Sequence, residues 1–132
     1  MKRYTIAYFV TLVVFLGIDA AWLTLMSERL YKPQLARLLA DRFSLGPAAL
    51  FYVVYVGGIL IFAVSPALKT GSWTTAALHG AVFGFCAYAT YDLTNQATLK
   101  DWPVLITVAD LFWGTLLTAT AATAGYLLSG TR

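Results

Sequence analysis

Three aspartates stand inside apolar stretches of this sequence, Asp19, Asp92 and Asp110. An ionised side chain deep in a bilayer costs at least about 2.5 kcal/mol, so acids of this kind usually face a protein interior and mark a site. Three acids at short range in a low dielectric cannot all stay ionised, so they share a proton or a cation holds them. The residues therefore predict a proton or cation site, or the acid and base of an enzyme.

Two of the aspartates lie in matching sequence motifs. Asp19-Ala-Ala-Trp22-Leu-Thr-Leu and Asp110-Leu-Phe-Trp113-Gly-Thr-Leu share the pattern D-x-x-W-x-T-L. At the i, i+3 spacing each aspartate and its tryptophan lie on one helix face, so Trp22 and Trp113 are candidates for the walls of a pocket. The match is either an inverted relation between the two ends of the chain or a chance similarity.

The third aspartate has polar neighbours of its own. Tyr88, Asp92 and Asn95 fall on one helix face, at i, i+4 and i+7. Lys100 follows, with a side chain long enough to reach back toward a carboxylate. In the alternative, structural interpretation, each aspartate only accepts hydrogen bonds from tyrosine, tryptophan, threonine or asparagine donors on neighbouring helices.

The composition places these residues in a membrane. The 132 residues are 60% hydrophobic and only 11% charged, with a net charge of +3. A chain of this size could not bury so much apolar surface in water, which excludes a soluble enzyme and a disordered or disulfide-linked secreted module. The basic residues flank apolar segments without forming a stripe, which indicates a lipid bilayer and no nucleic acid as partner. No organic cofactor motif is present, so we expect no cofactor beyond, at most, a divalent cation held by the aspartates.

Four segments are long and apolar enough to cross a membrane as helices, which takes about 20 residues each. They cover about 4–26, 46–68, 72–95 and 103–128. Between the first two, over about 30–42, apolar and charged residues recur at helical spacing, which predicts a short amphipathic helix on the membrane surface. Short later links make neighbours antiparallel. The predicted fold is an all-α integral membrane protein, an antiparallel four-helix transmembrane bundle that forms one domain over 1–132.

This topology brings the three aspartates to a similar depth. Asp19 lies seven residues before the end of the first segment, and Asp110 lies seven residues after Pro103. At a rise of about 1.5 Å per residue, both are about 10 Å deep at the same end of the bundle, and Asp92 is about 5 Å deep there. We therefore expect the three carboxyl groups to converge.

Two further patterns concern helix packing and the membrane interface. Gly80 and Gly84 lie one helical turn apart, which favours close helix contact inside the bundle or between two copies in a homo-oligomer. Tyr52, Tyr55 and Trp102 lie near segment ends and are predicted to be interfacial belt residues.

Several stretches of the sequence together carry a family resemblance. They begin at Asp19, Pro66, Ala87, Ala97 and Asp110, and they read DAAWL, PALKTGSW, AYATYDLTN, ATLKDWP and DLFWGT. In these stretches, and over essentially its whole length, the chain resembles a bacterial family of small predicted membrane proteins, domain of unknown function two-one-seven-seven. The resemblance implies a four-span, multi-pass protein of the bacterial inner membrane. It implies no activity and no catalytic residues.

Three classes of function stay open at this point. The first is binding or transport of a proton, a cation or a cationic small ligand, and it is narrowly favoured because it needs only the aspartates. The second is a membrane enzyme that modifies a lipid or an isoprenoid, which requires a lateral, aromatic-walled opening between helices. The third is a structural or assembly subunit of a membrane complex, which requires acids whose hydrogen bonds are all satisfied within the protein.

Overall fold

The first half of the chain begins with one long helical rod. The computed structural model describes residues 2–39 and 44–129, and every regular element within them is a helix, as predicted. The first rod consists of α1 (Lys2–Met26), the π-helical turn η1 (Ser27–Tyr31) and α2 (Lys32–Leu35), which follow one another without a break.

The end of this rod differs from the surface helix predicted over about 30–42. The helix continues only to Leu35 and is followed by a turn through residue 39, while residues 40–42 lie outside the described part of the chain. Leu30 and Leu35 are buried against Trp102 and Ile106. The apolar face of the segment is therefore covered by the protein's own helices, which the sequence pattern alone cannot distinguish from a face covered by lipid.

The second rod consists of α3 (Leu45–Ile59), the π-helical turn η2 (Leu60–Val64) and α4 (Ser65–Thr70). Pro66 does not end this helix, although it follows directly on η2 in the interior of the rod: the carbonyl of Phe62, to which a proline cannot donate, lies 3.2 Å from Nδ1 of His79. The helix ends instead at Gly71, whose φ of 69° is the left-handed conformation that glycine adopts without strain.

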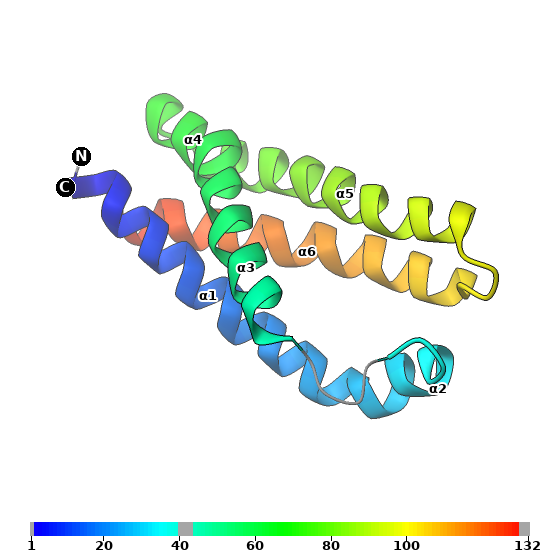
Figure 1. Ribbon diagram of the computed structural model, residues 1–132. Helices are drawn as coiled ribbons and strands as arrows, with labels where there is room; N and C mark the ends of the chain where they lie inside the picture. Colours follow the sequence, from blue (N-terminus) through cyan, green and yellow to red (C-terminus); the bar gives the residue numbers. More distant parts are fainter. Residues whose placement is uncertain (1, 40–43, 130–132) are drawn as a thin grey trace.

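The two remaining helices form the most extensive contact in the fold. α5 (Trp73–Thr98) and α6 (Val104–Ser129) run antiparallel and pack along their length (Figure 1). Gly80 and Gly84 of α5 are buried in this contact, and a Cβ atom at Gly80 would stand 2.9 Å from the carbonyl oxygen of Thr118. Their predicted use in close helix packing is confirmed inside the bundle, where α6 covers them, and a homo-oligomer through them stays a prediction.

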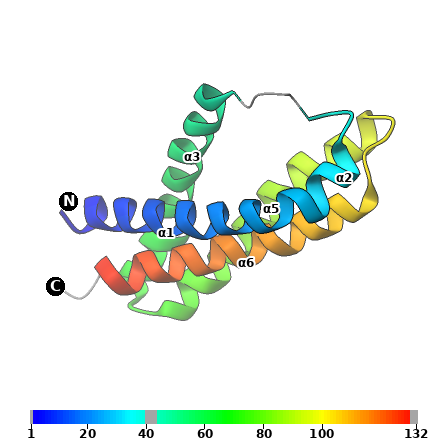
Figure 2. The same cartoon turned by 90° about the horizontal axis from the view of Figure 1, so that it is seen from below.

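The other elements pack on this pair unevenly. α1 packs against α6, and η2 packs against α1, α5 and α6. α3 contacts α1, and its first turns diverge from the α5–α6 pair (Figure 2). α1 begins and α6 ends at the same end of the bundle, as an even number of membrane crossings requires (Figure 1).

Three of the described helices are long and apolar enough to cross a membrane, namely Lys2–Leu35, Leu45–Thr70 and Val104–Ser129. α5 has 26 residues, a comparable length, but its final turns are polar. Of the four predicted spans, three therefore have the composition of a span, and the fourth is a long helix that packs along α6.

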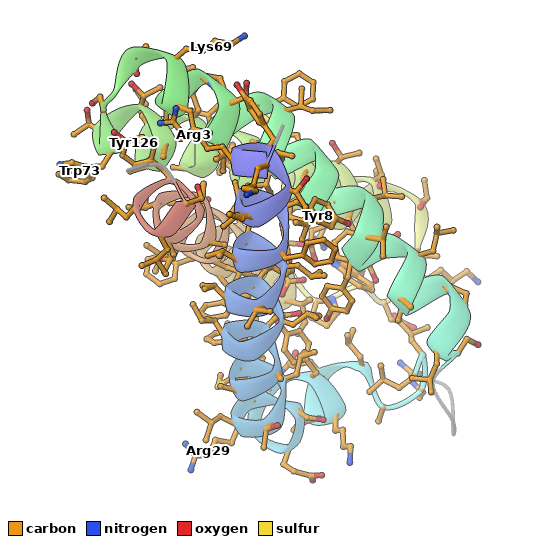
Figure 3. The ribbon with its side chains drawn as sticks, turned by 90° about the vertical axis from the view of Figure 1, so that its left-hand side faces the viewer. Arg3, Tyr8, Arg29, Lys69, Trp73 and Tyr126 are labelled. Atoms are coloured by element: carbon orange, nitrogen blue, oxygen red, sulfur yellow. The ribbon has the colours of Figure 1, made fainter. Side chains whose placement is uncertain are left out.

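Basic and aromatic residues gather at the ends of the bundle. Arg3, Lys69, Trp73 and Tyr126 lie at the end where α4 meets α5, and Arg29 lies at the opposite end (Figure 3). Side chains of these types are typical of the two membrane–water interfaces. Their positions indicate that the long axis of the bundle runs across the bilayer.

Candidate functional site

The carboxyl groups of Asp92 on α5 and Asp110 on α6 lie close enough to interact with each other. Asp92 is completely buried, and no donor among the described residues reaches either of its oxygens. Two carboxylates are both acceptors, so they bond only when one of them carries a proton. A buried polar group without a donor is rare in proteins, and it requires an explanation such as a proton held at the site. We describe these residues below as the aspartate pair.

Asp110 also receives a hydrogen bond from the rod that covers it. The hydroxyl of Tyr31 donates to Oδ1 of Asp110 over 2.5 Å, and Nε1 of Trp22 donates to the Tyr31 oxygen over 3.0 Å. Tyr31 is the last residue of the π-helical turn η1. Such turns change the face that a helix presents and are frequent at functional sites, so this one orients Tyr31 toward the aspartate pair.

Asp19 on α1 has a different environment, because two donors satisfy it. The hydroxyl of Tyr52 donates to Oδ2 over 2.6 Å, and Nε1 of Trp113 donates to Oδ1 over 3.2 Å. Within the described residues, no group of three or more His, Cys, Asp or Glu side chains is arranged to hold a metal ion. The three predicted aspartates therefore form one pair and one separate, satisfied carboxylate.

The two D-x-x-W-x-T-L motifs meet across the α1–α6 contact. The indole rings of Trp22 and Trp113 stack with centroids 4.3 Å apart and an angle of 9° between their planes. Trp113 donates directly to Asp19, and Trp22 donates to Asp110 through the Tyr31 hydroxyl. The motifs lie on antiparallel helices and make near-equivalent contacts, which a chance match of sequence does not require.

A cavity of about 510 Å³ lies over these groups, and we call it the carboxylate cavity. Its walls include the carboxyl groups of Asp19 and Asp110. Six aromatic residues line it: Trp22, Tyr31, Tyr88, Tyr91, Trp102 and Trp113. Its remaining walls are aliphatic or hydroxyl side chains: Leu23, Thr24, Ser27, Leu35, Leu39 and Ile106. The volume lies within the range of about 300–1,000 Å³ that is usual for small-molecule sites.

A second cavity, of about 300 Å³, lies on the other side of Asp110, and we call it the lateral cavity. Its walls are Phe51, Ala87, Tyr88, Tyr91 and Asp110. Tyr88, Tyr91 and Asp110 also line the carboxylate cavity. The two cavities therefore meet at the same three residues.

The segment over 27–39 covers the carboxylate cavity, and its contacts lie on the loop between α5 and α6. Two hydrogen bonds hold Trp102 in that loop. Its Nε1 donates to the hydroxyl of Thr107 over 3.1 Å, and its backbone carbonyl accepts from the side chain of Gln96 over 2.6 Å. Arg37 forms an exposed ion pair with Asp101 over 3.2 Å. An exposed pair of this kind contributes little, so the buried leucines and the Tyr31 hydroxyl hold the segment in place.

The remaining predicted site residues divide into two groups. Tyr88 lines both cavities, whereas Asn95 lines neither and lies near the side chain of Tyr91. Lys100 is exposed in the loop after α5, does not line either cavity and makes no ion pair with a described carboxylate. The predicted pairing of Lys100 with a carboxylate is therefore not seen among the described residues.

Sequence reasoning missed several tyrosines and one tryptophan. Tyr52 and Tyr55 were predicted to be belt residues, but Tyr52 bonds Asp19, and buried Tyr55 shares a hydrogen bond of 2.8 Å with Thr118. Trp102, another predicted belt residue, is buried in the wall of the carboxylate cavity. Tyr31 had no assigned role. An unpaired acid in one span predicts a hydroxyl donor at the same depth in another, which is the signal that could have found Tyr52.

The sequence model of the predicted membrane protein family DUF2177 matches residues 4–127. The chain belongs to this family. No curated protein and no solved structure matches it. The family description agrees with the helical rods and the apolar outer surface described above, so the protein is a predicted multi-pass membrane protein with three buried aspartates.

Proposed function

We propose that the protein binds a small organic cation in the carboxylate cavity, in exchange for the proton held by the aspartate pair. The observation that carries this proposal is the completely buried carboxyl of Asp92, which has no donor in the described structure and contacts Asp110. A positive ligand beside Asp110 would replace the charge of that proton. The proton would leave as the cation enters, so the net charge of the site would stay constant.

The walls of the cavity favour an organic cation over a metal ion. A cation over the face of tryptophan or tyrosine gains about 0.5–2 kcal/mol from the ring, in addition to the attraction of the carboxylates. Divalent metal ions prefer six or more oxygen ligands at close range. The aspartate pair and the separate Asp19 do not form such a set. A divalent cation is therefore the weaker candidate for this site.

A purely structural role fits the site less well. Structural networks of buried polar groups pair each acceptor with a donor, because an unsatisfied group costs about 1–3 kcal/mol. Asp19 meets this condition, but Asp92 does not. With the family resemblance, we further propose that the protein acts in the bacterial inner membrane.

The test uses the purified full chain in phosphatidylcholine nanodiscs, with tetramethylammonium as the probe. Titration calorimetry in two buffers of different ionisation enthalpy measures binding and the number of protons released. We expect the wild type to bind with release of about one proton, which linkage between the two ions requires. We expect Asp110→Asn to abolish binding, and Asp92→Asn to bind without proton release.

The matched control is Asp101→Asn, which removes a carboxylate from the exposed loop outside the carboxylate cavity. This variant should bind tetramethylammonium like the wild type. Binding that survives in Asp110→Asn, or that releases no proton in the wild type, would contradict the proposal.

A second candidate function is acid–base chemistry on a lipid or isoprenoid, and the lateral cavity favours it. That cavity is aromatic-walled, lies between α3 and α5 and reaches Asp110, as such an enzyme requires. In this case the aspartate pair would donate a proton to the substrate and recover one from it. Incubation of the protein with a bacterial lipid extract, followed by mass spectrometry, tests this second candidate function. The expected result is a lipid that the wild type changes and Asp110→Asn leaves unchanged. An extract that the wild type leaves unchanged contradicts this function.

A further inference from the structure

We infer that the ligand is an amphiphilic cation, whose charged head lies in the carboxylate cavity while an apolar tail lies in the lateral cavity. This inference rests on the proposed function, which supplies the charged head. The lateral cavity is the independent observation, because a compact cation would fill only the carboxylate cavity. The inference adds the chemical class of the ligand and the direction from which it arrives.

The shared walls of the two cavities carry the first step. Tyr88, Tyr91 and Asp110 line both, so the two cavities adjoin at these residues, and a molecule bound at Asp110 has apolar space next to it. Phe51 and Ala87 complete that space, and neither is ionisable. Asp110 is the one charged group of the lateral cavity. This arrangement fits a molecule with its positive charge at one end and hydrocarbon at the other.

The position of the opening carries the second step. Phe51 and Tyr91 are 45% and 57% exposed. Phe51 lies six residues into α3, whose first turns diverge from the α5–α6 pair (Figure 2), and Tyr91 lies seven residues before the end of α5. Tyr91 is therefore about 10 Å from the end of α5, at the depth of the acyl chains, and Phe51 lines the same cavity. The tail therefore meets the lateral cavity from the bilayer rather than from water.

The occupant that these features describe is an aliphatic amine or quaternary ammonium compound. Burying one methylene in an apolar site is worth about a four-fold gain in affinity relative to water. A longer tail should thus bind more tightly until the lateral cavity is filled. The affinity contributed by the cationic head should depend only on the aspartates.

The experiment compares tetramethylammonium with hexyltrimethylammonium on the full chain in phosphatidylcholine nanodiscs, with empty nanodiscs subtracted for partitioning. Ala87→Phe fills the lateral cavity with a ring. Cys86→Phe is the matched control, because Cys86 is the exposed neighbour on the same helix and lines neither cavity. We expect the wild type and Cys86→Phe to bind the hexyl compound more tightly. Ala87→Phe should lose at least about ten-fold of hexyl affinity and keep its tetramethylammonium affinity, since about two buried methylenes account for that factor.

The outcomes separate the two proposals. If the wild type binds neither compound, the proposed function fails and this inference fails with it. If tetramethylammonium binds but Ala87→Phe and the wild type show the same gain for the hexyl chain, only the inference is overturned. If Ala87→Phe gives no cooperative melting curve, Phe51→Ala replaces it, because Phe51 is a half-exposed wall of the lateral cavity. That variant should lose hexyl affinity selectively, and equal affinities for wild type and variant would overturn the inference.

Discussion

Asp92→Asn is the perturbation that most directly tests whether the aspartate pair holds a proton. Asparagine has nearly the same shape as aspartic acid, and its amide is a permanent hydrogen-bond donor to the Asp110 carboxylate. In the wild type the same bond exists only while the shared proton is present. The substitution therefore keeps the contact and removes its dependence on protonation.

The magnitude follows from the two charges that would otherwise face each other. Two unit charges about 4 Å apart interact by about 4 kcal/mol at an effective dielectric constant of about 20. A hydrogen bond to a charged group is worth about 1.5–3 kcal/mol. With the proposed shared proton, the folded wild type holds one more proton than the unfolded chain above the ordinary aspartate pKa of about 4, so its stability falls as pH rises from there through neutral. In acidic buffer at or below about pH 4, where both states hold the proton, wild type and Asp92→Asn should differ little.

The assay is the apparent Tm of the full chain in nanodiscs, followed by the fluorescence of the Trp22–Trp113 stack. In alkaline buffer we expect Asp92→Asn to be more stable than the wild type by about 1–3 kcal/mol. For a chain of this size that corresponds to about 4–12 °C in Tm. Asp101→Asn, which lies on the exposed loop, is the control and should follow the wild-type pH profile. If Asp92→Asn is less stable than the wild type at both pH values, Asp92 does not share a proton with Asp110 and the reasoning is wrong.

Three further substitutions test the packing and bonding around the site. Tyr31→Phe removes the hydroxyl that donates to Asp110, so the free energy of unfolding should fall by about 1.5–3 kcal/mol, measured by thermal melting; an unchanged Tm would contradict this bond. Gly84→Ala places a Cβ against the α6 backbone, whereas a Cβ at Gly17 meets nothing within 4 Å. Gly84→Ala should destabilise the protein by about 1–3 kcal/mol, whereas Gly17→Ala should be neutral or slightly stabilising. Equal effects of the two substitutions would refute the close α5–α6 approach. Trp113→Phe breaks the indole stack and removes a donor to Asp19, which should abolish the exciton-coupled indole signal in far-ultraviolet circular dichroism and cost about 1–3 kcal/mol; a retained signal would show that the rings do not stack.

The membrane class and the helical segments followed from the sequence with little ambiguity. Composition excludes a water-soluble fold, and the predicted spans 46–68, 72–95 and 103–128 fall within a few residues of the observed helices. The errors concern how segments end. The predicted span 46–68 continues through Pro66 to Thr70 and ends at Gly71, whose left-handed conformation closes the helix. α5 shows the other limit, because the sequence does not show that Asp92 is buried while Thr94 and Thr98 on the same helix are exposed.

The sequence also predicted some features of the candidate site and not others. The sequence predicted Asp19, Asp92 and Asp110 as special residues, because charge in an apolar stretch is costly wherever the chain folds. It also predicted the paired motif around Trp22 and Trp113. It could not predict that Asp92 and Asp110 form a pair while Asp19 is satisfied by Tyr52 and Trp113.

The sequence by itself determined that this protein lies in a membrane, that it forms long helices and that its three aspartates in apolar segments are unusual. These properties depend on the transfer of side chains between water and hydrocarbon. Only the tertiary structure decided which acid has a donor, where the two cavities join and what the segment over 27–39 covers. The physical reason is that hydrogen bonds and cavities depend on the relative rotation of neighbouring helices. A π-helical turn or a diverging helix changes that rotation, and neither leaves a periodic trace in the sequence.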